Sequence, residues 1–75
     1  MQIRLKLMGM LKAMTPPGGA IEVADGATID DVLRALDITS QTVRVFTVNG
    51  QFERNRSRVL AANDELSAIP PVGGG

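Results

Sequence analysis

Residues 2–8, Gln-Ile-Arg-Leu-Lys-Leu-Met, decide how this chain folds. The apolar residues Ile3, Leu5 and Leu7 alternate with polar ones, which is the period of a β-strand that buries one face. Met8 is out of phase with these three residues and is therefore expected at the surface. The pattern predicts a half-buried strand that begins almost at the first residue.

The segments that follow predict a hairpin and then one helix. Residues 15–19, Thr-Pro-Pro-Gly-Gly, are typical of a turn, and residues 20–24 can return as a second strand. After the turn at Asp25-Gly26, Thr28 is a candidate helix N-cap. Apolar residues then recur at helical spacing, at Ile29, Val32, Leu33 and Leu36. They predict an amphipathic helix of about three turns, which must pack on a sheet to be stable.

The second half of the chain predicts further strands. Residues 42–48 are rich in β-branched side chains, but their alternation does not decide which face points inward. The tight-turn signal Asn49-Gly50 comes next, followed by a short strand at 51–53 and a last strand at 65–69. This order is typical of an α+β roll in which one main helix packs across one face of a mixed sheet. With the first and last strands parallel at its centre, the roll is a ubiquitin-like β-grasp.

Composition excludes several classes of function. Eight Lys and Arg balance eight Asp and Glu, and a net charge of zero gives no electrostatic footprint for nucleic acid. The sequence has no Cys and no His, which removes thiol nucleophiles, the usual zinc ligands and the commonest general base. Charged residues interrupt the N-terminal apolar stretches, so neither a signal peptide nor a membrane span is expected. The expected location is the cytoplasm.

Several segments resemble the ThiS/MoaD sulfur carriers, in chain order. Residues 25–29 resemble the family's turn into its helix, and residues 48–50 its central turn. Leu60 and residues 63–66 resemble the segment before its last strand, with Asn63 where glycine is usual. Asparagine also tolerates left-handed backbone. The ending Pro70-Pro71-Val72-Gly73-Gly74-Gly75 resembles the family's terminal motif, in a form closer to the molybdopterin synthase small subunit than to the thiamine carrier.

The resemblance implies a division of the chain and a chemistry for its end. Residues 1–70 are expected to form the β-grasp domain, and residues 71–75 a flexible glycine tail. The carboxylate of Gly75 is implied as the site of adenylation and thiocarboxylate formation, while Gly73 and Gly74 let the tail thread into a narrow partner site, because glycine has no Cβ.

The resemblance also implies partners. The chain is expected to be a carrier and no enzyme, holding no metal or cofactor of its own. A ubiquitin-activating-type enzyme would use ATP and magnesium to adenylate the tail, and the large subunit of molybdopterin synthase would receive the sulfur. Three alternatives remain open: a thiamine-type or other biosynthetic carrier, a ubiquitin-like modifier conjugated through Gly75, and a binding domain with an inert tail.

The resemblance places apolar partner-contacting residues at Met8, Phe52 and Ile69, on the sheet face turned away from the helix. Each of the three can equally be a core residue. An exposed group of this kind marks a binding site. The arginines Arg54, Arg56 and Arg58 either decorate a solvated edge or provide a charged rim for that surface.

Overall fold

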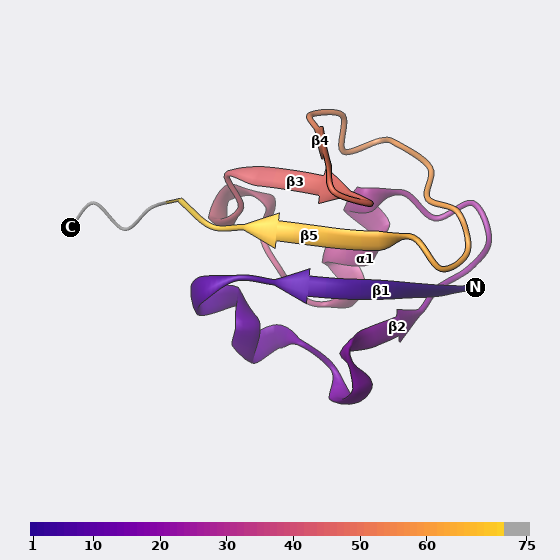
Figure 1. The fold of residues 1–75 in the computed structure, drawn as a ribbon, viewed down its shortest axis with the longest axis horizontal. Coiled ribbons are helices and arrows are strands. Elements are labelled where there is room, and N and C mark those ends of the chain that lie inside the picture. Colours follow the sequence, from indigo (N-terminus) through magenta and orange to yellow (C-terminus); the bar gives the residue numbers. More distant parts are fainter. Residues whose placement is uncertain (72–75) are drawn as a thin grey trace.

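The computed structural model describes residues 1–71, in which one α-helix packs against one face of a five-stranded sheet (Figure 1). The strands are β1 (Gln2–Leu7), β2 (Ala20–Glu22), β3 (Val45–Val48), β4 (Gln51–Glu53) and β5 (Glu65–Ile69). The helix is α1 (Ile29–Ala35), and three short 3-10 segments are η1 (Gly9–Met14), η2 (Pro17–Gly19) and η3 (Ser40–Thr42).

The first and last strands lie side by side in the middle of the sheet. The strand order is β2-β1-β5-β3-β4, and β1 runs parallel to β5 in a register that pairs Arg4 with Glu65 and Leu7 with Ala68. The other neighbours are antiparallel. The structure thus confirms the predicted mixed sheet, the parallel central pair and the single main helix across one face, which together define the β-grasp roll.

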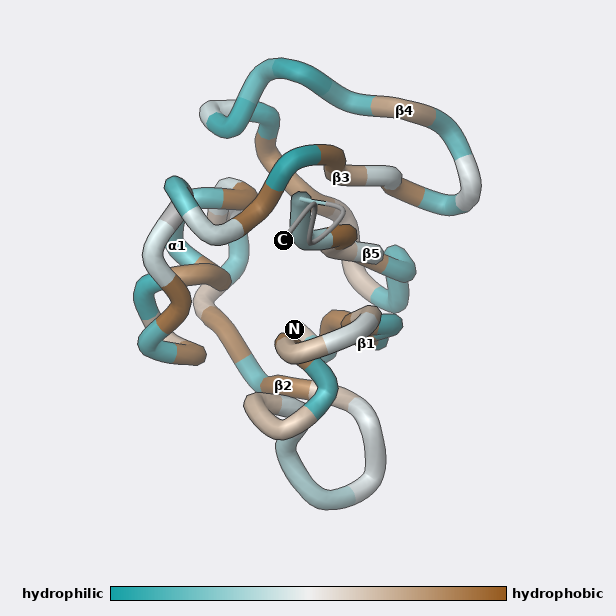
Figure 2. Tube along the Cα trace, turned by 90° about the vertical axis from the view of Figure 1, so that its left-hand side faces the viewer, coloured by the Kyte–Doolittle hydropathy of each residue, from teal (hydrophilic) through white to brown (hydrophobic). Residues whose placement is uncertain are grey.

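The core lies between α1 and the sheet. Ile3, Leu5 and Leu7 are buried while the residues between them are exposed, as the alternation predicts. Figure 2 views the strands nearly end on, with α1 on one side of the sheet and brown, apolar residues in both layers. We call the sheet face turned away from α1 the open face.

The start of α1 is fixed by a capping box. The Asp31 amide donates to the hydroxyl of Thr28 at 3.2 Å, and the Thr28 amide donates to the carboxylate of Asp31 at 3.0 Å. These bonds satisfy amides that have no partner within the helix. Thr28 is therefore the N-cap that the sequence predicts. The helix is shorter than predicted, with 7 residues or about two turns.

The third strand also begins later than expected. Residues 42–48 were candidates, but η3 ends at Thr42 and the backbone bends at Arg44, so pairing starts at Val45. Phe46 and Val48 point into the core, and Val45 lies half-buried. Val43, on the other side of the bend, is buried as well. Buried residues thus occur at both odd and even positions of this segment, which explains why its alternation was ambiguous.

Candidate docking surface and tail exit

The last strand leads the chain out of the body at one end of the sheet. In Figure 1 the yellow arrow of β5 points to one end of the sheet, and Pro70 and Pro71 follow it. Proline fixes φ near −65°, so these two residues stiffen the exit. Val72 and the predicted tail residues Gly73, Gly74 and Gly75 lie outside the described residues.

Gly9 accommodates the base of the exit. Its φ is +55°, a left-handed conformation, and a Cβ at this position would stand 3.1 Å from Cγ of Pro70. A side chain at residue 9 would therefore meet both backbone strain and a crowded neighbour. The amide of Met8 donates to the carbonyl of Ala68 at 3.1 Å, which ties the end of β1 to the end of β5. The stem of the tail is thus held by the segment that follows the first strand.

Met8, Ile69 and Phe52 all lie outside the core. Met8 is 39% exposed and Phe52 is 78% exposed, while Ile69 is half-buried. Val45 pairs with Ile69, and Met8 follows directly on the register that pairs Leu7 with Ala68. We call Met8, Val45, Phe52 and Ile69 the open-face patch. The core alternative is therefore excluded for Phe52, and the patch lies next to the tail exit.

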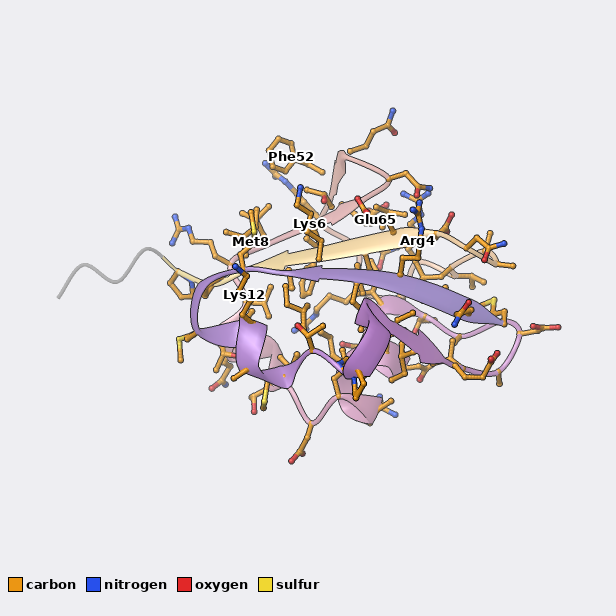
Figure 3. All side chains as sticks on the ribbon, turned by 60° about the horizontal axis from the view of Figure 1, so that its bottom comes forward. Arg4, Lys6, Met8, Lys12, Phe52 and Glu65 are labelled. Carbon is orange, nitrogen blue, oxygen red and sulfur yellow. The ribbon has the colours of Figure 1, made fainter. Side chains whose placement is uncertain are left out.

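Lys6 and Arg4 extend the open face away from the patch. Lys6 pairs with Ser67 and Arg4 with Glu65, and Thr47 pairs with both Ser67 and Phe52. Figure 3 shows Arg4, Lys6, Met8, Phe52 and Glu65 projecting from the same side of the sheet. Sequence reasoning did not single out Lys6 or Val45. For Lys6 the signal was present in the alternation of β1, in which every second residue leaves the core, whereas the alternation around Val45 was ambiguous.

The three arginines do not form one rim. Arg54 is exposed and lies beside Phe52 in the lining of a groove. Arg56 approaches Asp30 of α1 at 3.9 Å, and Arg58 binds the carboxylate of Glu53 at 2.9 Å. The backbone turns after Glu53 and runs toward α1, which separates Arg56 from the open-face patch. Of the three, the structure brings Arg54 to the predicted surface.

The ionisable groups with shifted pKa values make hydrogen bonds to neighbouring parts of the fold. Hydrogen bonds from the Asn55 amide and Arg58 lower the pKa of Glu53, and hydrogen bonds from Thr28 lower the pKa of Asp31. Bonds from the Ala61 amide and the Asn49 side chain lower the pKa of Asp64. The amino group of Met1 has a raised pKa, because it bonds to Glu22. None of these groups lies on the open-face patch.

Within residues 1–71 no group of three His, Cys, Asp or Glu side chains could hold a metal ion. No helix in that part of the chain is long and apolar enough to cross a membrane.

The fold and this exit define a ubiquitin-like β-grasp protein. Two crystal structures of small archaeal modifier protein 1 (SAMP1) from Haloferax volcanii are similar to it. One superimposes with a TM-score of 0.73 at 26% identity, covering 99% of each chain. The other gives 0.72 at 25% identity, covering 95% of this chain and 98% of that one.

The model of the ThiS family matches residues 5–75, so the chain belongs to the ThiS family. No curated protein matches it. Family membership and the two SAMP1 structures support a sulfur carrier or a ubiquitin-like modifier.

Proposed function

We propose that this protein carries sulfur as a thiocarboxylate on Gly75, and that it donates this sulfur in cofactor biosynthesis, with molybdopterin as the favoured product. The observation that carries the proposal is the exit of the chain: a central strand, held by its neighbours on both sides, delivers Pro70 and Pro71 to the end of the body beside an apolar patch. A carrier needs a rigid body, a recognisable surface and a free chain end at one place.

A carboxylate is a poor electrophile and must be activated before sulfur can replace its oxygen. In the proposed route, a carboxylate oxygen of Gly75 attacks the α-phosphorus of ATP, and pyrophosphate leaves. Sulfide, or a sulfur delivered from a partner's persulfide, then attacks the carbonyl carbon and AMP leaves. With sulfide, the product is the thiocarboxylate directly. With a persulfide, a second thiol of the partner must reduce the acyl disulfide to release it.

The reacting groups in this route belong to partners. The chain has no Cys or His to form a covalent intermediate, so an enzyme of the ubiquitin-activating type supplies the site for ATP and magnesium. In an extended conformation, Val72 to Gly75 reach roughly 13 Å, enough to separate the body from a buried site. The three glycines let this segment pass close to the walls of that site.

The open-face patch is the proposed contact for the activating enzyme and for the acceptor of the sulfur. Its exposed Phe52 and its position at the exit support this role. Aromatic side chains of this kind dominate the energetics of protein interfaces. Arg54 lies beside Phe52 and adds a positive charge. We do not include Arg56 and Arg58, because Arg56 approaches the carboxylate of Asp30 and Arg58 is paired with that of Glu53.

A ubiquitin-like modifier is the second candidate, and the likeness to the SAMP1 structures favours it. Both candidates share adenylation of Gly75. In the modifier, the amine of a target lysine attacks the carbonyl carbon of the acyl adenylate, AMP leaves, the nitrogen loses a proton, and an isopeptide bond forms. The thiamine-type carrier uses the same first steps with a different acceptor.

Intact mass separates these candidates. The protein is incubated with ATP, magnesium, the activating enzyme and a sulfur donor. A gain of one sulfur in exchange for one oxygen supports the carrier, whereas high-mass conjugates that vanish on deletion of Gly74 and Gly75 support the modifier. If neither product forms, the proposal is wrong and the tail is inert.

Deletion of Gly75 alone provides the matched control. It should abolish activation and leave the unfolding midpoint unchanged, provided the tip buries nothing. If the deletion lowers the unfolding midpoint, the tail has a structural role and the loss of activation cannot be assigned to chemistry. Supply of the purified product to a molybdopterin synthase large subunit or to a thiazole-forming enzyme then identifies the acceptor.

A further inference from the structure

The edge of the sheet carries a groove that includes Val45, Phe52 and Arg54 of the proposed docking surface and continues past them along β3. It is open along the side of β3 and has a volume of about 770 Å³. Its lining is Gln41, Val43, Arg44, Val45, Phe46, Phe52, Glu53, Arg54 and Pro71. We call it the edge groove. It combines apolar side chains from both faces of β3 with two arginines.

The groove exists because β4 leaves β3 early. The two strands pair only from Phe46 opposite Glu53 to Val48 opposite Gln51. On its other side β3 continues to pair with β5, where Val45 lies opposite Ile69 and the Arg44 amide donates to the Ile69 carbonyl at 2.8 Å. Residues 44 and 45 are thus fixed by β5, while β4 does not cover their other edge.

Local hydrogen bonds keep that edge uncovered. The Asn55 amide donates to Glu53 at 3.1 Å, and the Ser57 amide donates to the side chain of Asn55 at 3.0 Å, which turns the chain after β4. The Asp30 amide then donates to the Arg56 carbonyl at 3.0 Å and draws the chain toward α1. The departure of the chain from β3 is therefore built into the fold.

The charge of the groove is positive. Arg44 and Arg54 line it, and within residues 1–71 neither forms an ion pair with a carboxylate. Glu53, the single acidic residue in the lining, is held by Arg58 at 2.9 Å. The occupant that fits this lining carries apolar side chains for Val45 and Phe52 and acidic side chains for the two arginines.

We propose that the edge groove binds an extended, acidic segment of a partner protein, which adds to β3 as a further strand where β4 ends. An uncovered strand edge is a template for such addition, in which backbone bonds give affinity and alternate side chains give specificity. A segment bound there contacts Pro71, so the partner lies directly beside the exit of the tail. The groove shares Val45, Phe52 and Arg54 with the proposed docking surface, so the inference rests on that proposal and adds the form and charge of the partner segment. It holds for a carrier and for a modifier alike.

A fluorescent peptide tests the inference on the full chain. The probe has a Val-Leu-Val centre with glutamates on both sides, and the matched control peptide has lysines in their place. Fluorescence anisotropy should show binding of the acidic peptide, weakened by salt, and no binding of the basic one. Arg44→Glu with Arg54→Glu should lower the affinity by about tenfold or more, since two favourable charge contacts become repulsive.

Arg34→Glu is the control variant. Arg34 is exposed on α1, away from the groove, and its reversal should leave the affinity unchanged. Thermal unfolding of each variant shows whether the fold is retained. Backbone amide shifts on adding the acidic peptide should be centred on residues 43–46 and 52–54.

Four outcomes would overturn the inference. Equal binding of both peptides shows a nonspecific apolar surface, and shifts centred on α1 place the site elsewhere. Concentration-dependent shifts of residues 43–46 without peptide identify a second copy as the occupant. Shifts of Gly73 to Gly75 caused by Arg54→Glu alone identify the chain's own tail.

Discussion

At the scale of single residues, Asp64 joins three separate parts of the chain. Its carboxylate accepts bonds from the Ala61 amide at 2.8 Å and from the Asn49 side chain at 2.9 Å. Its carbonyl accepts from the Arg4 amide at 2.9 Å. Asn49 in turn accepts from the Glu65 amide at 2.9 Å. The β3–β4 turn, the entry to β5 and strand β1 are thus connected through one side chain and its neighbour.

Asp64→Ala is expected to lower the free energy of unfolding by about 1–3 kcal/mol, because two bonds to a charged acceptor are lost. Urea unfolding measures the change, and Gln51→Ala, an exposed change in β4, is the control. An Asp64 variant as stable as the control would show that these bonds contribute nothing net.

The same residue gives stability a pH dependence. Its bonds lower the pKa of Asp64 from the ordinary value of 3.8. A group whose pKa is lower in the folded state contributes stability above its ordinary pKa and loses it as the pH falls through the folded value. Unfolding midpoints should therefore be steady near neutral pH and fall below about pH 4, less steeply in Asp64→Ala. A variant with the unchanged slope would assign the acid sensitivity to Asp31 and Glu53 alone.

At the scale of elements, α1 depends on its cap. With about two turns, the helix is too short to be stable by propensity, so its first turn must be held. Thr28→Ala should cost about 1 kcal/mol of unfolding free energy, and Thr28→Ser should recover most of it. The exposed Thr39, beyond the helix, serves as a control position. If Thr28→Ser and Thr28→Ala are equally destabilised, the hydroxyl is not what holds the helix.

The elements also show which parts of the secondary structure could be predicted from the sequence. Alternation in residues 2–8 and the polar start of the helix act locally, and the first strand and the helix start were predicted correctly. The 3-10 segment η1 was not predicted, since such short segments have no marked periodicity. Its first residue, Gly9, has left-handed backbone and lies beside Pro70, which is far away in the chain. The late start of β3 reflects the bend at Arg44, and no pattern in the sequence predicted this bend.

The candidate site, like the strands and the helix, was predicted in part. Exposure of Met8 and Phe52 was expected from their phase and polar surroundings, and the structure confirms it. The alternating arginines did not indicate that the turn at Asn55 would bring Arg56 toward Asp30 and Arg58 toward Glu53. The edge groove was not predicted either, because it results from the same turn. Side chains are placed by the backbone path, and this path depends on tertiary contacts.

At the scale of the whole molecule, the proposed docking surface and the buried core lie on opposite faces of the sheet. Phe52→Ala should change the free energy of unfolding by less than about 1 kcal/mol, because the ring is 78% exposed. Leu66→Ala, at a position with 0% exposure, should cost about 2–5 kcal/mol. Activation by the adenylating enzyme should be weakened by Phe52→Ala at a temperature where both proteins are folded. A large loss of stability in Phe52→Ala would contradict the separation of the two faces.

The parallel pairing of β1 with β5 has a mechanical consequence. Met1 and Pro71 lie at opposite ends of this central pair, so tension between them acts along both strands (Figure 1). The bonds from Arg4–Glu65 to Leu7–Ala68 are then loaded in shear and must break together. Tension applied at Gln2 and Glu65, on one end of the pair, would instead peel them apart one by one. A pull on Pro71 against a body held at Met1 therefore acts along the direction in which this central pair resists best.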